Sequence, residues 1–198
     1  MEKRLLFVCA ANVCRSPLMQ FEFSGLVAAD GGSGEWRLQS AGAHVAGSLP
    51  VCSVVDEILA RDGVAHDDVA AHRSRQIDAD LIEDADLVIT ASLAERAVVA
   101  RLVPTARERT FTLREANVLS ADVTGAASLD EVAVELNKRR AYGLLPTVRA
   151  GWSFGRPHPL DIPDDHGSRA PKHAGTLSAA RAYIRTFHTQ LARALAEA

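Results

Sequence analysis

The sequence predicts an α/β fold with a parallel β-sheet, and three observations support this. Short apolar runs of strand length alternate with longer segments in which apolar residues recur at helical spacing. The first run, residues 4–9, is continuously apolar after Arg4, as expected for a central strand covered on both faces. The strand–helix order repeats four times, which specifies parallel strands joined by right-handed crossovers.

The boundaries of the predicted elements carry recognisable signals. We expect Ser16 to be the N-cap of a helix with Pro17 in its first turn, and Pro50 to open the next helix. Ser92 and Glu95 form a capping box for a third helix. The predicted strands cover residues 4–9, 36–42, 85–90 and 109–113, and the last helix covers roughly residues 176–196.

One segment does not fit the alternating order. Residues 114–160 follow the fourth predicted strand and contain a second capping box, Ser128 with Glu131, before a stretch rich in glycine and proline. We therefore expect a single domain over residues 1–198, in which residues 114–160 form an insertion or a long ordered loop near the functional site.

The composition is that of an ordinary globular protein. Of the 198 residues, 47% are hydrophobic and 24% are charged, which argues against disorder. The net charge of −3 gives no basic field for nucleic acid, and no apolar run has membrane-spanning length. Three cysteines, two of them five positions apart, do not make a disulfide framework, so a reducing cytoplasm is the expected location.

The loop after the first predicted strand carries the candidate chemistry. Cys9 ends the strand and Arg15 stands where the next helix begins, at the sheet edge where α/β proteins bind ligands. Backbone N–H groups of the turn and the helix N-terminus suit an anion, and the planar guanidinium of Arg15 matches phosphate oxygens. The same positive field favours the thiolate of Cys9, which is then a nucleophile aimed at phosphorus.

Two polar residues are expected to support this loop. The hydroxyl of Ser16 can hydrogen-bond to the Cys9 thiolate, and Asn12 can fix the turn through a left-handed backbone conformation. The alternative is that Cys9 is a small buried apolar residue and Arg15 a solvated helix residue. The pattern Cys-x5-Arg-Ser-Pro between an apolar strand and a helix favours the reactive loop.

The stretch VCAANVCRSP resembles the signature of the low-molecular-weight protein tyrosine phosphatase family, and residues 38–42, 71–77 and 84–90 resemble further family segments in the same order. The resemblance implies a three-layer fold with a four-stranded sheet of order 2-1-3-4. It also implies a protein-tyrosine-phosphatase that forms a phosphocysteine on Cys9 and needs no cofactor. Ala11 stands where the family usually has glycine, and a positive φ there would cost about 1 kcal/mol.

The resemblance also implies roles for individual residues. A hydrogen-bond network that rigidifies the loop falls on Asn12, Ser16, Ser40 and His72. Cys14 is either a redox residue that pairs reversibly with the nucleophile or a passive packing residue. The phosphate-binding loop comprises Ala10, Ala11, Asn12, Val13, Cys14, Arg15 and Ser16.

Displacing an alkoxide or phenolate calls for a general acid. The family supplies it from an Asp-Pro-aromatic-Gly motif near the C-terminus, which LDIPDDHGS (160–168) resembles. This match implies Asp164 as the acid, with Asp161 and Asp165 as competitors. Asp165 replaces the proline of the motif and His166 replaces its aromatic residue.

The expected substrate is a phosphorylated protein, with phosphotyrosine first, or a small aryl phosphate. Trp152 or Phe154 could supply the aromatic wall that His166 does not. The alternatives are a thiol-dependent arsenate reductase, a protein arginine phosphatase and a non-catalytic phosphate- or phosphopeptide-binding module. Arginine phosphatases of this family have threonine where this chain has Val13. No nucleic acid or membrane partner is expected, and the oligomeric state, monomer or weak dimer, is left open.

The remaining histidines and cysteine give no signal of a metal site. His158, His166 and His173 lie seven to eight positions apart in a loop, without the cysteine or carboxylate spacing of a known site, so no metal is expected. Cys52 lies on the apolar side of a predicted helix and is expected in the core.

Overall fold

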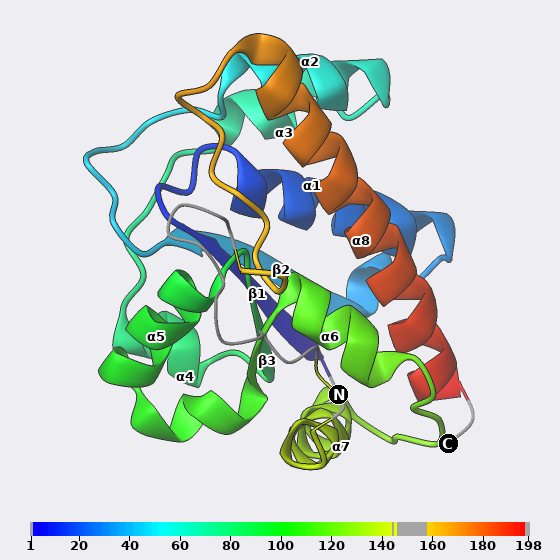
Figure 1. Ribbon diagram of the computed structural model, residues 1–198. Coiled ribbons are helices and arrows are strands. Elements are labelled where there is room, and N and C mark those ends of the chain that lie inside the picture. Colours follow the sequence, from blue (N-terminus) through cyan, green and yellow to red (C-terminus); the bar gives the residue numbers. More distant parts are fainter. Residues whose placement is uncertain (1, 144, 146–157, 197–198) are drawn as a thin grey trace.

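A four-stranded parallel sheet with helices on both faces forms the centre of the protein (Figure 1). The computed structural model describes residues 2–143, 145 and 158–196. The strand order is β2-β1-β3-β4 and every neighbouring pair runs parallel, so the predicted fold class and strand order are confirmed. The strands are β1 (Lys3–Cys9), β2 (Trp36–Gly42), β3 (Leu87–Thr90) and β4 (Thr110–Thr112).

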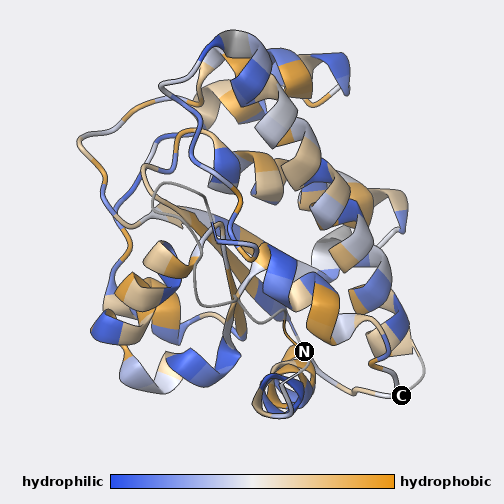
Figure 2. Cartoon of the chain, in the orientation of Figure 1, coloured by the Kyte–Doolittle hydropathy of each residue, from blue (hydrophilic) through white to orange (hydrophobic). Residues whose placement is uncertain are grey.

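The helices divide between the two faces of the sheet. Along β1, Leu5 and Phe7 pack into one core with α1, α6, α7 and α8, while Leu6 and Val8 pack into a second core with α4 and α5. Figure 2 shows the strands in hydrophobic colours between helices of mixed colour. The helices are α1 (Arg15–Ala29), α2 (Ser53–Arg61), α3 (His66–Ala71), α4 (Ala79–Glu83), α5 (Leu93–Leu102), α6 (Leu113–Ser120), α7 (Leu129–Ala141) and α8 (Ala170–Ala196).

Several helix boundaries differ from the prediction. Helix α1 begins at Arg15 with Cys14 as its N-cap, so Ser16 lies inside the first turn and is not the cap. Helix α2 begins at Ser53 and not at Pro50. Helix α8 begins at residue 170, earlier than the predicted start near residue 176. The short helices α3, α4 and α6 were not predicted, because five to eight residues carry too little periodicity.

The capping prediction for α5 is only partly right. Ser92 is the N-cap, but its hydroxyl accepts the backbone N–H of Ala94. The carboxylate of Glu95 accepts the Ser92 hydroxyl and does not return to the Ser92 backbone. Glu95 is 4% exposed, and this position makes it available to the loop after β1.

The segment after β4 contains helices α6 and α7. Thr112 and Glu115 form a capping box for α6. The capping box predicted for α7 is only half formed: Ser128 accepts the backbone N–H of Glu131, but the Glu131 carboxylate accepts the N–H of Ala127 and not that of Ser128. Glu115 is fully buried and pairs with Arg96 at 2.7 Å and with Arg140 at 2.8 Å, which joins α6 to α5 and α7. Trp152 and Phe154 lie outside the described residues.

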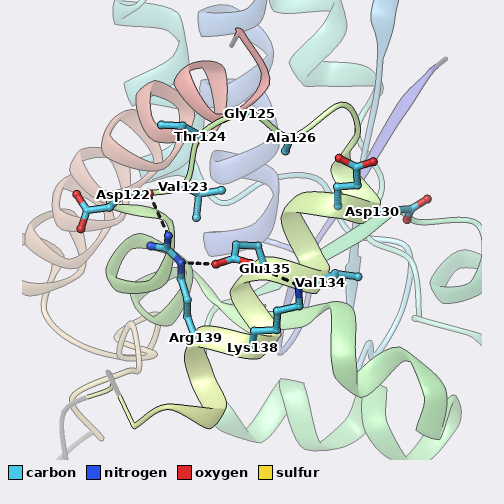
Figure 3. Close-up of a pocket in the computed structure, with 11 residues that line it drawn as sticks. Asp122, Val123, Thr124, Gly125, Ala126, Asp130, Val134, Glu135, Lys138 and Arg139 are labelled. Carbon is cyan, nitrogen blue, oxygen red and sulfur yellow. Dashed lines mark hydrogen bonds and ion pairs between the residues drawn. The ribbon is translucent and has the colours of Figure 1, made fainter. Parts of the chain in front are cut away.

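A cavity of about 490 Å³ lies between α7 and the connection that precedes it (Figure 3). Arg139 crosses it and donates to Glu135 Oε1 at 3.0 Å and to the carbonyl of Asp122 at 3.0 Å. Its lining comes from residues 122–139 and includes no residue of the loop after β1. Among the described residues, no helix combines the length and apolar character needed to cross a membrane.

Candidate active site

The loop between β1 and α1 surrounds the sulfur of Cys9. Cys9 is 2% exposed, and its Sγ accepts the backbone N–H of Asn12 at 3.3 Å and the hydroxyl of Ser16 at 3.1 Å. Ser16 is free for this contact because Cys14 takes the N-cap position of α1. Two donors at the sulfur stabilise a negative charge there.

Asn12 holds the loop in shape. Its φ is 56°, in the left-handed region, as predicted. The buried side-chain amide donates to Ser16 Oγ and to Ser40 Oγ, both at 3.0 Å, and its oxygen accepts the backbone N–H of Arg75 at 3.0 Å. His72 Nε2 donates to the Asn12 carbonyl at 2.9 Å. The structure therefore brings together the four residues expected to support the loop.

Ala11 does not need the conformation that alanine disfavours. Among the described residues, Asn12 is the one residue other than glycine with a positive φ. Ala11 is exposed at the tip of the loop. The cost of about 1 kcal/mol that a positive φ would impose on alanine therefore does not arise.

Gly42 is a residue of the site that sequence reasoning did not single out. It ends β2 beside the loop, where its N–H donates to the carbonyl of Arg75 at 2.9 Å. A Cβ at this position would lie 2.9 Å from the Ala10 carbonyl oxygen and 2.5 Å from a methyl of Val45. The first of these contacts is with backbone and cannot move aside. Only glycine lets β2 lie this close to the loop.

Arg15 is buried, with 4% of its surface exposed, and contacts from three residues hold its guanidinium. Its Nη1 donates to the carbonyl of Ile162 at 3.1 Å, and its Nη2 pairs with Asp164 Oδ2. Glu95 Oε1 lies 3.7 Å from the same Nη2. The sequence indicates only a helix cap for Glu95, so its place beside Arg15 is a feature that only the folded structure reveals.

The three neighbouring aspartates have different surroundings. Asp161 Oδ1 accepts the backbone N–H of Leu93 at 2.9 Å, which places it at the N-terminus of α5. Asp165 is buried and accepts hydrogen bonds from Lys172 at 2.6 Å and from Thr176 at 2.5 Å. Both contacts lower the pKa of its carboxyl, and the contact with Lys172 has the larger effect. Asp164 has a side chain 49% exposed and faces Arg15.

An open cleft of about 740 Å³ lies beside Arg15 and the three aspartates, next to the loop after β1. It is bounded by residues from three parts of the chain: the loop after β1, the start of α5 and the segment before α8. Its polar lining is Arg15, Ser92, Glu95, Asp161, Asp164, Asp165 and Lys172.

The two other cysteines lie together on the far side of the loop. Cys14 is buried and its Sγ lies 3.0 Å from His166 Nδ1. Cys52 is half-buried as the N-cap of α2, not fully in the core as predicted, and its Sγ lies 3.5 Å from His173 Nε2. A hydrogen bond from Cys14, with others from His173 and the Val55 N–H, lowers the pKa of Cys52 to about 5.

Replacing Gly42 by alanine tests the close approach of β2 to the loop. We expect Gly42→Ala to lower the free energy of unfolding by about 1–3 kcal/mol, because the added methyl overlaps backbone atoms of residues 10 and 11. Gly47→Ala is the matched control, since nothing lies within 4 Å of a Cβ at that position. Urea unfolding of both variants measures the difference, and equal stability would contradict the packing argument.

His72 gives a test based on pH. Burial lowers its pKa below the usual value of about 6.5, although its bond to the Asn12 carbonyl opposes the shift. The unfolded chain therefore binds this proton more readily, so the His72 contribution to stability is complete above about pH 6.5 and is lost as pH falls through the lower folded pKa. NMR titration should give a pKa below 6.5, and His72→Gln should lose less stability between pH 7 and 5 than the parent chain.

The family model described as low molecular weight phosphotyrosine protein phosphatase matches residues 4–124. The chain is 35% identical over 88 residues to the low molecular weight protein-tyrosine-phosphatase YfkJ of Bacillus subtilis, covering 43% of this chain and 53%, about half, of that relative. It is 29% identical over 117 residues to a protein-arginine-phosphatase of Geobacillus stearothermophilus, covering 58% of this chain and 72% of the other.

Similarity extends to the three-dimensional fold. The crystal structure of a YwlE mutant from Bacillus subtilis superposes with a TM-score of 0.66 at 20% identity, covering 96% of this chain and 99% of that one. The family model covers more than half of the chain, including the Cys9 loop, β2, His72 and β3. The chain belongs to the low molecular weight phosphotyrosine protein phosphatase family.

Proposed function

We propose that this chain is a cysteine-dependent phosphomonoesterase and that its preferred substrates are phosphotyrosine proteins or small aryl phosphates. The observation that carries the proposal is the sulfur of Cys9, which accepts two hydrogen bonds inside a loop that ends at the buried Arg15. A stabilised thiolate beside a fixed guanidinium is the arrangement that phosphoryl transfer to sulfur requires.

In the first step, Cys9 Sγ attacks phosphorus, the S–P bond forms and the bond from phosphorus to the leaving oxygen breaks. Asp164, protonated at the start, gives its proton to that oxygen. Arg15 and the loop N–H groups bind the phosphoryl oxygens, whose charge they neutralise. No metal ion takes part in this scheme.

In the second step, Asp164 accepts a proton from water as the water oxygen attacks phosphorus. The S–P bond breaks, Cys9 leaves as thiolate and inorganic phosphate is released. The hydroxyl of Ser16, 3.1 Å from the sulfur, stabilises this leaving thiolate. The same hydrogen bond thus assists both steps.

The contacts of Arg15 support this sequence of events. Its Nη1 bond to the Ile162 carbonyl and its proximity to Glu95 orient the guanidinium from behind. The contact with Asp164 is made by a half-exposed carboxylate, which can exchange for a phosphate oxygen as substrate enters the cleft. Asp164 then lies next to the bound phosphate, where a proton donor is needed.

Asp164 is favoured over its neighbours as the acid because they are committed elsewhere. Asp161 accepts from the N-terminus of α5, and Asp165 is held by Lys172 and Thr176. Asp165 is buried and held by two partners, so it is not free to turn to a substrate, whereas the contact of the half-exposed Asp164 with Arg15 can be exchanged when phosphate enters the cleft. Asp164 faces the cleft and Arg15.

Val13 bears on the choice between phosphotyrosine and phosphoarginine. It is half-buried in the loop next to Asn12 and has no hydroxyl. This apolar surface favours an aromatic leaving group, and YfkJ is named a protein-tyrosine-phosphatase. A protein arginine phosphatase is the second candidate, because one relative carries that name. A thiol-dependent arsenate reductase and a phosphate-binding module are the third and fourth candidates.

We place the whole chain in one domain acting in the cytoplasm.

Parallel assays test the reaction and the substrate class. We expect turnover of a phosphotyrosine peptide and p-nitrophenyl phosphate, slower turnover of phosphoarginine, and no thiol-dependent reduction of arsenate. Cys9→Ser should lower kcat about a thousandfold or more, because the nucleophile is lost. Its circular dichroism spectrum checks that the variant folds. Undiminished hydrolysis by Cys9→Ser would refute the mechanism, and phosphopeptide binding without turnover would favour the binding module.

Leaving-group dependence tests the acid. Asp164→Asn should lower kcat about 10²–10⁴-fold with phenyl phosphate, whose phenolate needs a proton, and much less with p-nitrophenyl phosphate. Asp161→Asn is the matched control, because it lies in the same loop and bonds the α5 N-terminus. The control should slow both substrates equally. If Asp164→Asn also slows both substrates equally, Asp164 is not the acid.

A further inference from the structure

Four metal-ligating side chains from four parts of the chain meet on the far side of the phosphate loop. They are Cys14, Cys52, His166 and His173, and one donor atom from each lies within 4.8 Å of all the others. Histidine spacing alone indicated no metal site, and His158 is outside this cluster. The fold adds the two cysteines, which lie far from the histidines in sequence.

The donor atoms of the cluster lie close to the separations of tetrahedral coordination. Cys14 Sγ lies 3.0 Å from His166 Nδ1, and Cys52 Sγ lies 3.5 Å from His173 Nε2. A zinc ion with bonds of about 2.3 Å to sulfur and about 2.0 Å to nitrogen separates neighbouring donors by about 3.3–3.8 Å. The two S–N separations of 3.0 and 3.5 Å lie within about 0.3 Å of this range, and all other donor pairs lie within 4.8 Å.

The donor set is that of a structural zinc site, with two cysteines and two histidines. We propose that Cys14, Cys52, His166 and His173 bind one zinc ion in a closed tetrahedral site. Two thiolates balance the charge of Zn²⁺, so the half-buried cluster would carry no net charge. A disulfide between the cysteines would leave the convergence of both histidines unexplained.

His173 is the buried histidine of the cluster. Its ring is 5% exposed, and its Nδ1 has no hydrogen-bond partner among the described residues. Its Nε2 lies 3.5 Å from the Cys52 sulfur, and the imidazole of His166 packs edge to face against the same ring. Zinc bound to Nε2 would leave the Nδ1 N–H still without an acceptor, so the position of Nε2 beside the Cys52 thiol, and not the unpaired Nδ1, supports the proposal.

The backbone holds each ligand in place. The N–H of Cys52 donates to the Val13 carbonyl at 2.9 Å, which joins the start of α2 to the phosphate loop. His166 and His173 rings meet edge to face with centroids 5.5 Å apart. The start of α8 lies beside α2 (Figure 1), and the two helices are in contact. Cys14, Cys52 and His173 thus lie at helix ends, and His166 lies in the segment before α8.

Zinc bound to this cluster would act on the active site through the residues that lie next to its ligands in the sequence. Cys14 directly precedes Arg15, and His166 is two positions after Asp164. The metal would therefore link the phosphate loop to the segment that carries the proposed acid. A zinc-bound Cys14 would also be unavailable for a disulfide with Cys9.

Metal analysis of the reduced full-length chain tests the proposal without an activity measurement. After dialysis in zinc-buffered solution, we expect one zinc per chain by mass spectrometry. Replacement by Co²⁺ should give thiolate-to-cobalt absorption and the intense visible bands of tetrahedral cobalt. Cys9→Ser should retain the zinc, because Cys9 is not in the cluster. This variant separates a failure of the zinc site from a failure of the proposed reaction.

Ligand variants complete the test. Cys52→Ser, His173→Asn and His166→Asn should each weaken zinc binding by about 100-fold or more. His166 is exposed, so its variant should stay folded even if the buried His173 does not tolerate replacement. His158→Asn is the matched control and should bind zinc like the parent chain. Substoichiometric zinc in the parent chain, an octahedral cobalt spectrum, unchanged affinity in His166→Asn, or zinc lost with Cys9→Ser would each overturn the proposal.

Discussion

The hydrogen bonds of Asn12 are the interaction on which the rest of the site depends. A left-handed backbone costs a residue other than glycine about 1 kcal/mol, and a buried amide left unpaired costs more. Here the side chain bonds Ser16, Ser40 and the backbone of Arg75, and the carbonyl accepts from His72. The turn is thereby fixed by β2 and by the segment after α3. The N–H of Asn12 is thereby held toward the Cys9 sulfur at 3.3 Å without further ordering, which strengthens its electrostatic effect.

A second constraint comes from the segment before α8, which brings a carboxylate to a loop nearly 150 positions earlier. The N–H of Ile162 donates to the Ala91 carbonyl at 2.8 Å, so this segment joins the end of β3. Asp161 and Asp165 anchor it to α5 and α8 on either side. Asp164 lies between two fixed neighbours, and its own side chain stays half exposed. Anchoring the flanks leaves the middle carboxylate positioned and free to exchange partners.

How far the sequence predicts this protein follows from the range of each interaction. The strands β1 and β2 and the loop after β1 were predicted nearly to the residue, because apolar runs and the Cys-x5-Arg spacing are local. Glu95 and Gly42 were missed as site residues, since their roles depend on atoms far away in the chain. The start of α1 was misplaced because Ser16, a good N-cap by type, donates to the Cys9 sulfur instead.

Residues 160–168 depart from the family motif at two positions, and both replacing side chains make polar contacts. Asp165 stands in place of proline, and its carboxylate fixes the start of α8 through Thr176. His166 stands in place of the aromatic residue, and its ring contacts Cys14 instead of forming an apolar wall. In this chain the segment is held by polar contacts to α8 and to the phosphate loop, and these contacts place His166 beside Cys14 and the ring of His173.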